Sequence, residues 1–298
     1  MRQDLDREPT KAALPCATVG DDHRAAIELV VTDLDGTLWD GTGRIHPRTI
    51  GALEILAEAR LPVLAATGRS ARSAWAVMEA NRIALPGVFL DGAIGLEYGA
   101  TKAYYRCEFT PALAAETLEL LDRLGVSPCI NVEGPGRDIV LGEHPMTHPE
   151  YLRRLQPWLR DEDPWTAVES LNILSFSMLA SDLATARSLA QEVSGRLKVA
   201  AAVSPDRTYG GAHLSFRPLG VNKWAGVLAY CASQGLDSGH VLAIGDADND
   251  VELLEGACVA LAVKDATPAA LARADQVIEP ASQGGWAELL ELAGLPGQ

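Results

Sequence analysis

The chain has 298 residues, of which 48% are hydrophobic, enough for one large or two medium-sized domains with a real core. Its formal net charge of -15 argues against the basic face that nucleic-acid-binding proteins need, but a metal ion and one lysine can still make a single site locally positive for a small phosphorylated ligand. No apolar run reaches the ~20 residues of a membrane span, and the N-terminus is charged where a signal peptide is apolar. We therefore expect a soluble cytoplasmic protein with neither a nucleic-acid nor a membrane partner.

Residues 1–26 lack hydrophobic periodicity, which predicts a flexible N-terminal extension without a chemical role. The cysteines are scattered, odd in number and free of any CxxC pair, which favours reduced buried thiols over a disulfide framework or a zinc site. They are Cys16, Cys107, Cys129, Cys231 and Cys258.

Strands and helices alternate in the segment that follows. The expected elements are, in chain order, a strand at 27–32, a helix beginning near Pro47, a strand at 61–66, a helix around Trp75 and Met78, and a strand at 88–90. The strands are short apolar runs, as in a parallel sheet that is buried on both faces. This alternation is typical of an α/β fold.

The pattern changes over residues 93–217. Turn-rich stretches such as 133–136 lie between apolar runs, and residues 213–217 alternate between apolar and polar, like a strand with one solvated face. We expect a separate α+β unit with antiparallel strands here.

The parallel pattern then returns, with a helix that carries Trp224 and Cys231 and with strands at 241–244, 259–262 and 276–278. The sequence therefore predicts a discontinuous α/β core over 27–92 and 218–298 with residues 93–217 inserted as a second domain.

Polar residues follow three of the predicted core strands. Asp33 and Asp35 leave the first strand, Thr67 follows the second, and Asp246 follows a strand of the last segment. Open α/β sheets bind ligands at the carboxyl ends of their strands, so these side chains should meet. Carboxylates in one cleft repel one another unless a cation joins them, and Mg²⁺ suits such hard oxygen ligands. Lys223 and Thr67 would add a charge and a hydroxyl for phosphate oxygens.

With these clusters the chain resembles the haloacid dehalogenase superfamily of phosphohydrolases, and most of all its branch of Cof-type sugar-phosphate phosphatases. The resemblance spans about residues 27–290 and implies a Rossmann-like parallel-sheet core with helices on both faces and an inserted α+β cap domain. The motifs that carry it are Asp33-Leu34-Asp35-Gly36-Thr37, Thr67-Gly68-Arg69, Lys223 within Gly220-Val221-Asn222-Lys223, and Gly245-Asp246-Ala247-Asp248-Asn249-Asp250.

The resemblance also implies an activity, the Mg²⁺-dependent hydrolysis of a small phosphorylated metabolite through an aspartyl-phosphate on Asp33. Asp35 would protonate the leaving oxygen and later deprotonate the attacking water. The implied magnesium ligands are the Asp33 carboxylate, the Asp35 carbonyl and Asp246. The implied substrate-binding groups are the Leu34 amide, Thr67, the Gly68 amide, Arg69, Lys223 and Asn249, while Asp250 would support the metal shell or orient Lys223.

Two positions depart from the family pattern. Asp91 stands where relatives usually have Asn before Gly-Ala, and Trp224 follows Lys223 where a small residue is more usual. Asp91 borders the predicted hinge of the insert, so its identity bears on the substrate. The weaker candidates are predicted to be ordinary loop, strand or packing residues. They are Glu133, Asp138, His144, His148, Trp158, Trp165, His213 and Arg217.

Two other functions remain open on the same scaffold. A phosphomutase would return the phosphoryl group to a sugar, and a phosphate-sensing or scaffold protein would not catalyse at all. The intact motifs weigh against the second. We expect a monomer or a small homo-oligomer.

Overall fold

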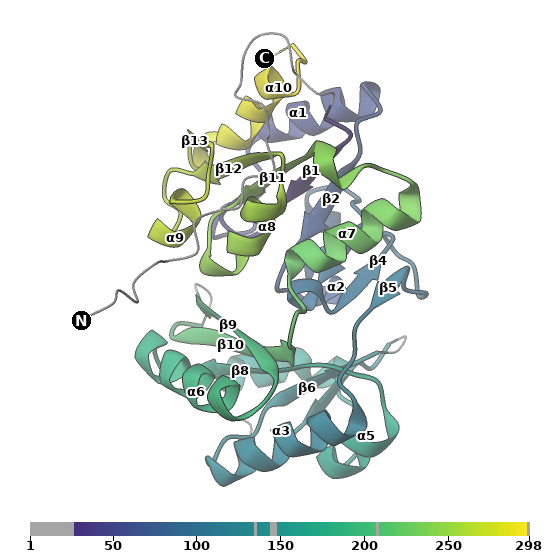
Figure 1. The fold of residues 1–298 in the computed structure, drawn as a ribbon, viewed down its shortest axis with the longest axis vertical. Coiled ribbons are helices and arrows are strands. Elements are labelled where there is room, and N and C mark those ends of the chain that lie inside the picture. The colour runs from purple at the N-terminus through teal and green to yellow at the C-terminus, as the bar shows by residue number, and fades with distance from the viewer. Residues whose placement is uncertain (1–26, 134–135, 144–147, 207–208, 297–298) are drawn as a thin grey trace, which may run out of the picture.

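The computed structural model describes residues 27–133, 136–143, 148–206 and 209–296 (Figure 1). The predicted extension over residues 1–26 and the candidate His144 lie outside these residues. The chain forms two bodies, each built on one sheet. The first sheet has eight strands in the order β13-β12-β11-β1-β2-β3-β4-β5, and the second has five in the order β7-β6-β8-β10-β9. This confirms the predicted fold class, an α/β core with an inserted α+β unit.

The strands and helices that the alternating pattern predicts are all present in the first body, together with further short elements. The first sheet consists of β1 (Leu29–Thr32), β2 (Val63–Ala66), β3 (Gly87–Phe89), β4 (Ile94–Leu96), β5 (Tyr105–Arg106), β11 (Val241–Gly245), β12 (Val259–Val263) and β13 (Gln276–Ile278). Its helices are α1 (Pro47–Glu58), α2 (Ala71–Ala80), α7 (Lys223–Gln234), α8 (Val251–Gly256), α9 (Pro268–Leu271) and α10 (Leu289–Leu292).

The second body contains the remaining strands and helices. Its strands are β6 (Cys129–Val132), β7 (Ile139–Leu141), β8 (Ile173–Ala180), β9 (Val199–Pro205) and β10 (Ala212–Pro218). Its helices are α3 (Pro111–Arg123), α4 (Pro149–Leu155), α5 (Pro164–Ser170) and α6 (Leu183–Arg196). Within the described residues of both bodies, no helix combines the length and the apolar character that a membrane crossing requires.

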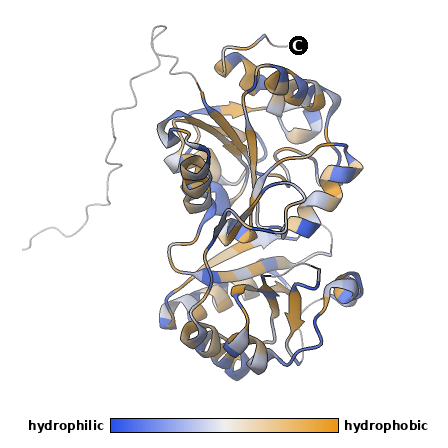
Figure 2. Ribbon diagram, turned by 90° about the vertical axis from the view of Figure 1, so that its right-hand side faces the viewer, coloured by the Kyte–Doolittle hydropathy of each residue, from blue (hydrophilic) through white to orange (hydrophobic). Residues whose placement is uncertain are grey.

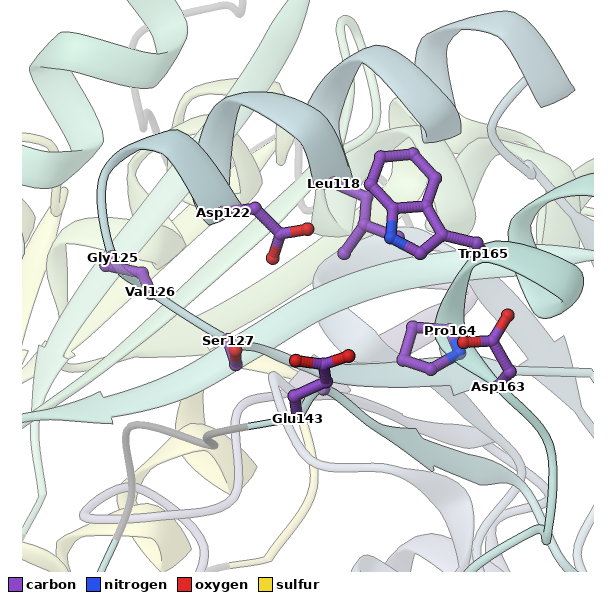
Figure 3. Close-up of a pocket in the computed structure, with 10 residues that line it drawn as sticks. Leu118, Asp122, Gly125, Val126, Ser127, Glu143, Asp163, Pro164 and Trp165 are labelled. Atoms are coloured by element: carbon purple, nitrogen blue, oxygen red, sulfur yellow. The ribbon is translucent and has the colours of Figure 1, made fainter.

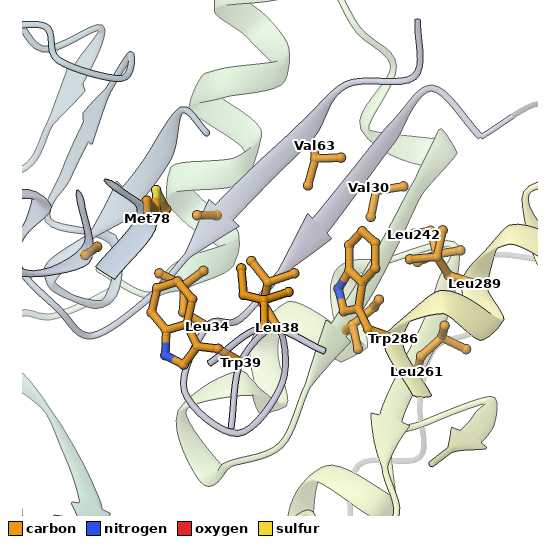
Figure 4. Close-up of a cluster of buried hydrophobic side chains, with 14 of the residues drawn as sticks. Val30, Leu34, Leu38, Trp39, Val63, Met78, Leu242, Leu261, Trp286 and Leu289 are labelled. Carbon is orange, nitrogen blue, oxygen red and sulfur yellow. The ribbon is translucent and has the colours of Figure 1, made fainter. Parts of the chain in front are cut away.

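The centre of the first sheet is parallel and buried on both faces. β1 pairs in parallel with β2 on one side and with β11 on the other. Successive side chains of a strand point to opposite faces, so Val30 packs with Leu242 and Trp286 on one face (Figure 4), while Leu29 and Val31 belong to a second cluster on the other. Figure 2 shows the resulting hydrophobic strands at the centre of this body. An uninterrupted apolar run is therefore required here, as the sequence indicates.

The first sheet extends further along the chain than predicted. β3 pairs antiparallel with β4, and β4 pairs antiparallel with β5, so residues 94–106 belong to this sheet. The prediction placed these residues in the insert. The two added strands have only three and two residues, which is too few to show a periodicity. They form because β3 offers a free edge for pairing, and local sequence does not reveal such an edge.

The second sheet has one apolar and one polar face, and all its pairings are antiparallel. Phe176 and Leu214 point into the cluster that α3 and α6 cover. Their neighbours in sequence point to the other face, where the Asn131 amide donates to the hydroxyls of Ser175 (2.9 Å) and Ser177 (3.0 Å). This polar face lies toward the first body (Figure 1). On that side β9 packs against the 3-10 turn Asp248–Asp250.

Candidate active site

The polar strand ends converge because β1 lies between β2 and β11 in a parallel sheet. Asp33 follows β1, Thr67 follows β2, and Asp246 follows β11, so all three leave the sheet at its carboxyl edge. Each of these polar side chains is buried. Buried polar groups need partners, and the partners come from the neighbouring loops.

Three carboxylates form a tight buried cluster at this edge. Asp33, Asp246 and Asp250 each offer an oxygen, and these oxygens lie within 4.8 Å of one another. The Lys223 ammonium lies 2.7 Å from Asp33 Oδ1 and 2.6 Å from Asp250 Oδ1. Asp250 Oδ2 accepts the backbone amides of Asp246 and Ala247, both at 3.0 Å. Asp250 thus fixes both Lys223 and the loop that carries Asp246.

Electrostatics at the cluster favour a further positive charge. Burial raises the pKa of Asp33 well above its usual range, and the carboxylates of Asp250 and Asp246 add to this effect, while Lys223 opposes it. Burial lowers the pKa of Lys223, but the charges of Asp250 and Asp33 outweigh it and raise that pKa, so the ammonium stays charged. One ammonium therefore faces three carboxylates. The hard-oxygen donors and the excess negative charge fit a Mg²⁺ ion.

Asp35 lies beside the cluster, but its carboxylate points to other partners. Arg69 binds it through two nitrogens, at 2.5 Å from Nε to Oδ2 and 2.6 Å from Nη2 to Oδ1. The Trp39 indole donates to Oδ1 at 3.0 Å. Burial raises the pKa of Asp35, but the hydrogen bonds and charge of Arg69 outweigh it, so the pKa lies below its usual range. Asp35 is 46% exposed and is held as a carboxylate at the open side of the site.

The other motif residues gather around a side chain that the sequence analysis did not include among the site residues. Asn249 Nδ2 donates to Asp91 Oδ1 at 2.8 Å. A Cβ on Gly68 would lie 3.1 Å from the same oxygen. The Thr67 hydroxyl accepts the Arg69 amide at 3.1 Å. Thr67, Gly68 and Asn249 are therefore neighbours, whereas the Arg69 side chain turns to Asp35.

Asp91, which the sequence analysis placed at the hinge of the insert, is the principal residue that it left out of the site. It is 3% exposed and lies 2.8 Å from Arg217 Nη1, and its Oδ2 accepts the Ser215 hydroxyl at 3.2 Å. Burial raises the pKa of Asp91, but the charges of Arg217 and Lys223 outweigh it and lower that pKa. The available signal was Asp91-Gly92 after the third strand, an acidic strand end like the others. Arg217, which we predicted to be an ordinary strand residue, is buried against it.

The weaker candidates of the insert have structural partners. Glu133 accepts from Arg106 (2.6 Å) and from Asn172 (2.9 Å). Asp138 pairs with Arg72 of α2 at 2.8 Å, and the same guanidinium lies 4.3 Å from the Trp158 ring centroid. The remaining candidates show three different settings: His148 caps α4 through Nδ1, His213 lies on β10 with a pKa that burial lowers, and Trp165 is 42% exposed. Trp165 therefore packs only in part, and it lines a cavity together with Leu118 and Pro164.

A cavity of about 300 Å³ lies in the second body, away from the carboxylate cluster (Figure 3). Its charged lining consists of Asp122, Glu143 and Asp163. Burial and the Glu143 charge raise the pKa of Asp122. A wall of carboxylates repels phosphate, so this cavity is no candidate for the phosphate site.

Comparison with known proteins agrees with this geometry. A family model described as haloacid dehalogenase-like hydrolase matches residues 30–290. A phosphoglycolate phosphatase of Methanopyrus kandleri is 28% identical over 271 residues, covering 88% of this chain and 95% of that protein. A pyridoxal phosphate phosphatase of Escherichia coli is 26% identical over 268 residues, covering 84% of this chain and 92% of that protein.

Solved structures share the fold at low sequence identity. A phosphatase of the haloalkanoate superfamily from Bacteroides thetaiotaomicron has a TM-score of 0.73 at 18% identity, and the match covers 93% of this chain and 98% of that one. A sugar phosphatase of subclass IIB has a TM-score of 0.69 at 20% identity, covering 90% of this chain and 99% of that one. At such identities the likeness shows that the fold is shared.

Proposed function

We propose, from the premise that this chain belongs to the haloacid dehalogenase-like hydrolases, that it is a Mg²⁺-dependent phosphatase of a small phosphorylated metabolite. The observation that carries the proposal is the buried cluster in which Lys223 contacts Asp33 and Asp250 beside Asp246. Such a cluster has a nucleophile, a fixed cation and hard-oxygen ligands in one place. These are the parts that phosphoryl transfer needs.

Asp33 is the proposed nucleophile. Lys223 and the strand end hold its carboxylate in one orientation, so one oxygen can form a bond to phosphorus while the bond to the leaving oxygen breaks. In the second step a water oxygen attacks phosphorus and the bond to Asp33 breaks, which releases phosphate and restores the carboxylate. Lys223 stays charged throughout and offsets the charge on the phosphoryl oxygens.

Asp35 is the proposed acid and base. It would give a proton to the leaving oxygen in the first step and take one from the attacking water in the second. The contact with Arg69 stabilises the ionised form, which is the form that the second step needs, and the proton taken from water in that step is the one given to the leaving oxygen in the next cycle. Arg69 and Trp39 also fix where this carboxylate lies relative to Asp33.

The proposed metal ligands are the carboxylates of Asp33 and Asp246 and the backbone carbonyl of Asp35. A bound Mg²⁺ supplies positive charge to the phosphoryl oxygens and offsets the repulsion among the carboxylates. Asp250, whose two oxygens already bind Lys223 and two amides, keeps the role of a support. The Leu34 and Gly68 amides, Thr67 and Asn249 are the proposed phosphate-binding groups.

The second body is the proposed cap that selects the substrate. Because β4 and β5 belong to the first sheet, we place its start after Arg106 and not at residue 93. Its polar face carries neutral hydroxyl and amide groups such as Asn131, Ser175 and Ser177, which suit a hydroxylated leaving group. The curated relatives are phosphatases of phosphoglycolate and of pyridoxal phosphate, and one solved relative is a sugar phosphatase, so a small metabolite is the proposed substrate.

A phosphate-release screen tests this function. The purified chain is incubated with Mg²⁺ and a panel of sugar, cofactor and carboxylate phosphomonoesters, with parallel samples in chelator and in Ca²⁺. We expect release with Mg²⁺, none with chelator, and little with Ca²⁺, because the looser coordination of Ca²⁺ misplaces the attacking carboxylate. Unchanged release after exhaustive chelation contradicts the metal. Conversion of a sugar phosphate to its isomer without free phosphate identifies a phosphomutase, and no turnover of any ester favours a sensing role.

A further inference from the structure

Asp91 occupies a backbone conformation that its neighbours enforce. Leu90 (φ 51°) and Asp91 (φ 52°) are left-handed, and Gly92 (φ 105°) follows them. Such conformations are rare outside glycine and persist where the surrounding structure over-determines them. Here a Cβ on Gly92 would lie 2.0 Å from the Asn222 carbonyl oxygen, so the turn after β3 touches the loop by which the chain returns from the insert.

The turn is bonded to both loops of the proposed phosphate site. The amides of Leu90 and Asp91 donate to the carbonyls of Arg69 (2.9 Å) and Thr67 (3.0 Å). The Asp91 carboxylate lies against Gly68 and accepts from Asn249 on the far side. An amide nitrogen has two hydrogens, so the bond to Asp91 directs the other one. Asp91 therefore orients Asn249 relative to the Thr67–Arg69 loop.

The same carboxylate is bonded to the insert. Its second oxygen meets Ser215 and Arg217, which lie on β10 where the chain returns from the insert. Arg217 also donates to the Val221 carbonyl at 3.3 Å, in the loop that leads to Lys223. A charge at this position next to a phosphate site would repel phosphate if it stood alone. Arg217 offsets it.

We propose that Asp91 is a positioning residue that sets the Asn249 amide for phosphate and links it to the insert through Arg217. This inference rests on the proposed function. It assigns Asp91 no contact with the reacting atoms. Removing it should weaken phosphate binding through Asn249, and only through Asn249.

The test is a double-mutant cycle on the full chain, with inorganic phosphate and Mg²⁺ as the probe in calorimetry. We expect Asp91→Ala to weaken phosphate binding about tenfold to a hundredfold, by analogy with the loss seen when a hydrogen-bond partner of a metal ligand is removed. Asn249→Ala should weaken it similarly, and the double variant should be no worse than Asn249→Ala alone. Asp91→Asn keeps an acceptor oxygen and should restore most of the binding.

Asp91→Ala leaves the Arg217 charge buried without a partner, which can unfold a protein. The cycle is therefore repeated in an Arg217→Met background, so that Asp91→Ala leaves no unpaired arginine charge. The same coupling between Asp91 and Asn249 is expected there. Asp138→Ala serves as the matched control, because Asp138 also pairs with an arginine across the two bodies, whereas the Asn249 amide, within the part of the chain that the structure describes, donates to Asp91. The fold-changes in phosphate affinity caused by Asp138→Ala and by Asn249→Ala should multiply in the double variant, as for two independent sites.

Two results overturn the inference. One is a folded double variant in which the fold-losses of phosphate affinity from Asp91→Ala and from Asn249→Ala multiply. The other is phosphate binding by Asp91→Ala within twofold of the parent chain. Both leave the proposed function intact. A parent chain that binds no phosphate with Mg²⁺ contradicts the site itself, and with it the proposed function.

Discussion

At the scale of single residues, the site depends on how few positive groups face its carboxylates. Lys223 is 1% exposed and donates to both Asp33 and Asp250, so its charge is neutralised inside the cluster. Arg69 forms an ion pair with Asp35, and Arg217 forms one with Asp91. Asp33 and Asp250 thus share one cation, and the Thr37 hydroxyl donates to Asp246 Oδ1 at 3.4 Å. The proposed Mg²⁺ at Asp33 and Asp246 would add positive charge to this acidic cluster.

The residue-scale prediction concerns Asp33. Asp33→Asn keeps the shape and removes the nucleophilic oxygen, so phosphate release should fall roughly a thousandfold or more. The fold should persist, because Lys223 still forms its ion pair with Asp250 and the substitution removes one of three mutually repelling carboxylates. Steady-state release and thermal unfolding measure both effects.

Asp182→Asn is the control for that substitution. Asp182 is an exposed N-cap of α6, and Asn caps a helix as well as Asp does, so activity and stability should stay unchanged. Substantial turnover by folded Asp33→Asn contradicts the nucleophile assignment.

At the scale of elements, short segments from the far end of the chain support the catalytic strand. Trp286, in the 3-10 turn Gly285–Glu288, is fully buried beneath β1. Its indole donates to the Thr32 hydroxyl at 3.0 Å, and that hydroxyl donates to the Asp33 carbonyl at 2.6 Å. The C-terminal segment therefore packs the core and also fixes Thr32, the residue before the proposed nucleophile Asp33.

The element-scale prediction compares two tryptophans. Trp286→Ala should lower the free energy of unfolding by about 3–5 kcal/mol, because it empties a large buried site and leaves Thr32 without its donor. Trp165→Ala, at a position that is 42% exposed, should cost less than about 1 kcal/mol. Urea denaturation measures both. Equal losses in the two variants contradict the assignment of Trp286 to the core.

At the scale of the whole molecule, two of the contacts between the bodies bear on how the second body is held. One is the junction of Asp91 with β10, where the chain crosses between them. The other is Arg72 of α2, which reaches Asp138 and Trp158 of the second body. The second contact involves no chain connection, so it is made by side chains alone. If the second body is the proposed cap, a contact of this kind would let it exclude water during reaction and still open.

The prediction at this scale is that Arg72→Ala loosens the second body. Burial raises the pKa of Asp138, with Arg72 opposing, so the loss of Arg72 raises that pKa further. The closed form then binds a proton more readily than the open form, and closure weakens as pH rises through the raised pKa. Amide exchange around residues 136–141 should be several-fold faster at pH 7 than in the parent chain, after correction for intrinsic rates, with a smaller difference at pH 5.

A second substitution checks the cause. Asp138→Asn in the Arg72→Ala background removes the titrating group, so the pH dependence should disappear while some loosening remains. A pH dependence that persists in the double variant points to another group.

The sequence by itself determined the architecture of the first body and the identity of its motif residues. Short apolar runs such as residues 29–32, alternating with helical patterns, favour a parallel sheet buried on both faces, and such a sheet brings Asp33, Thr67 and Asp246 to one edge. Local pattern is enough for this, because burial and strand direction follow from the chain itself. It was also enough to mark the insert as antiparallel.

Only the tertiary structure decided which partner each of these residues has. Arg69 turned to Asp35, Asn249 to Asp91, and residues 94–106 joined the first sheet. None of these choices has a signal in local pattern, since a contact between Asp91 and Asn249 spans 158 positions and depends on how three loops pack. Side chains with several possible partners take the one that packing brings within 3 Å, and packing is a property of the whole fold.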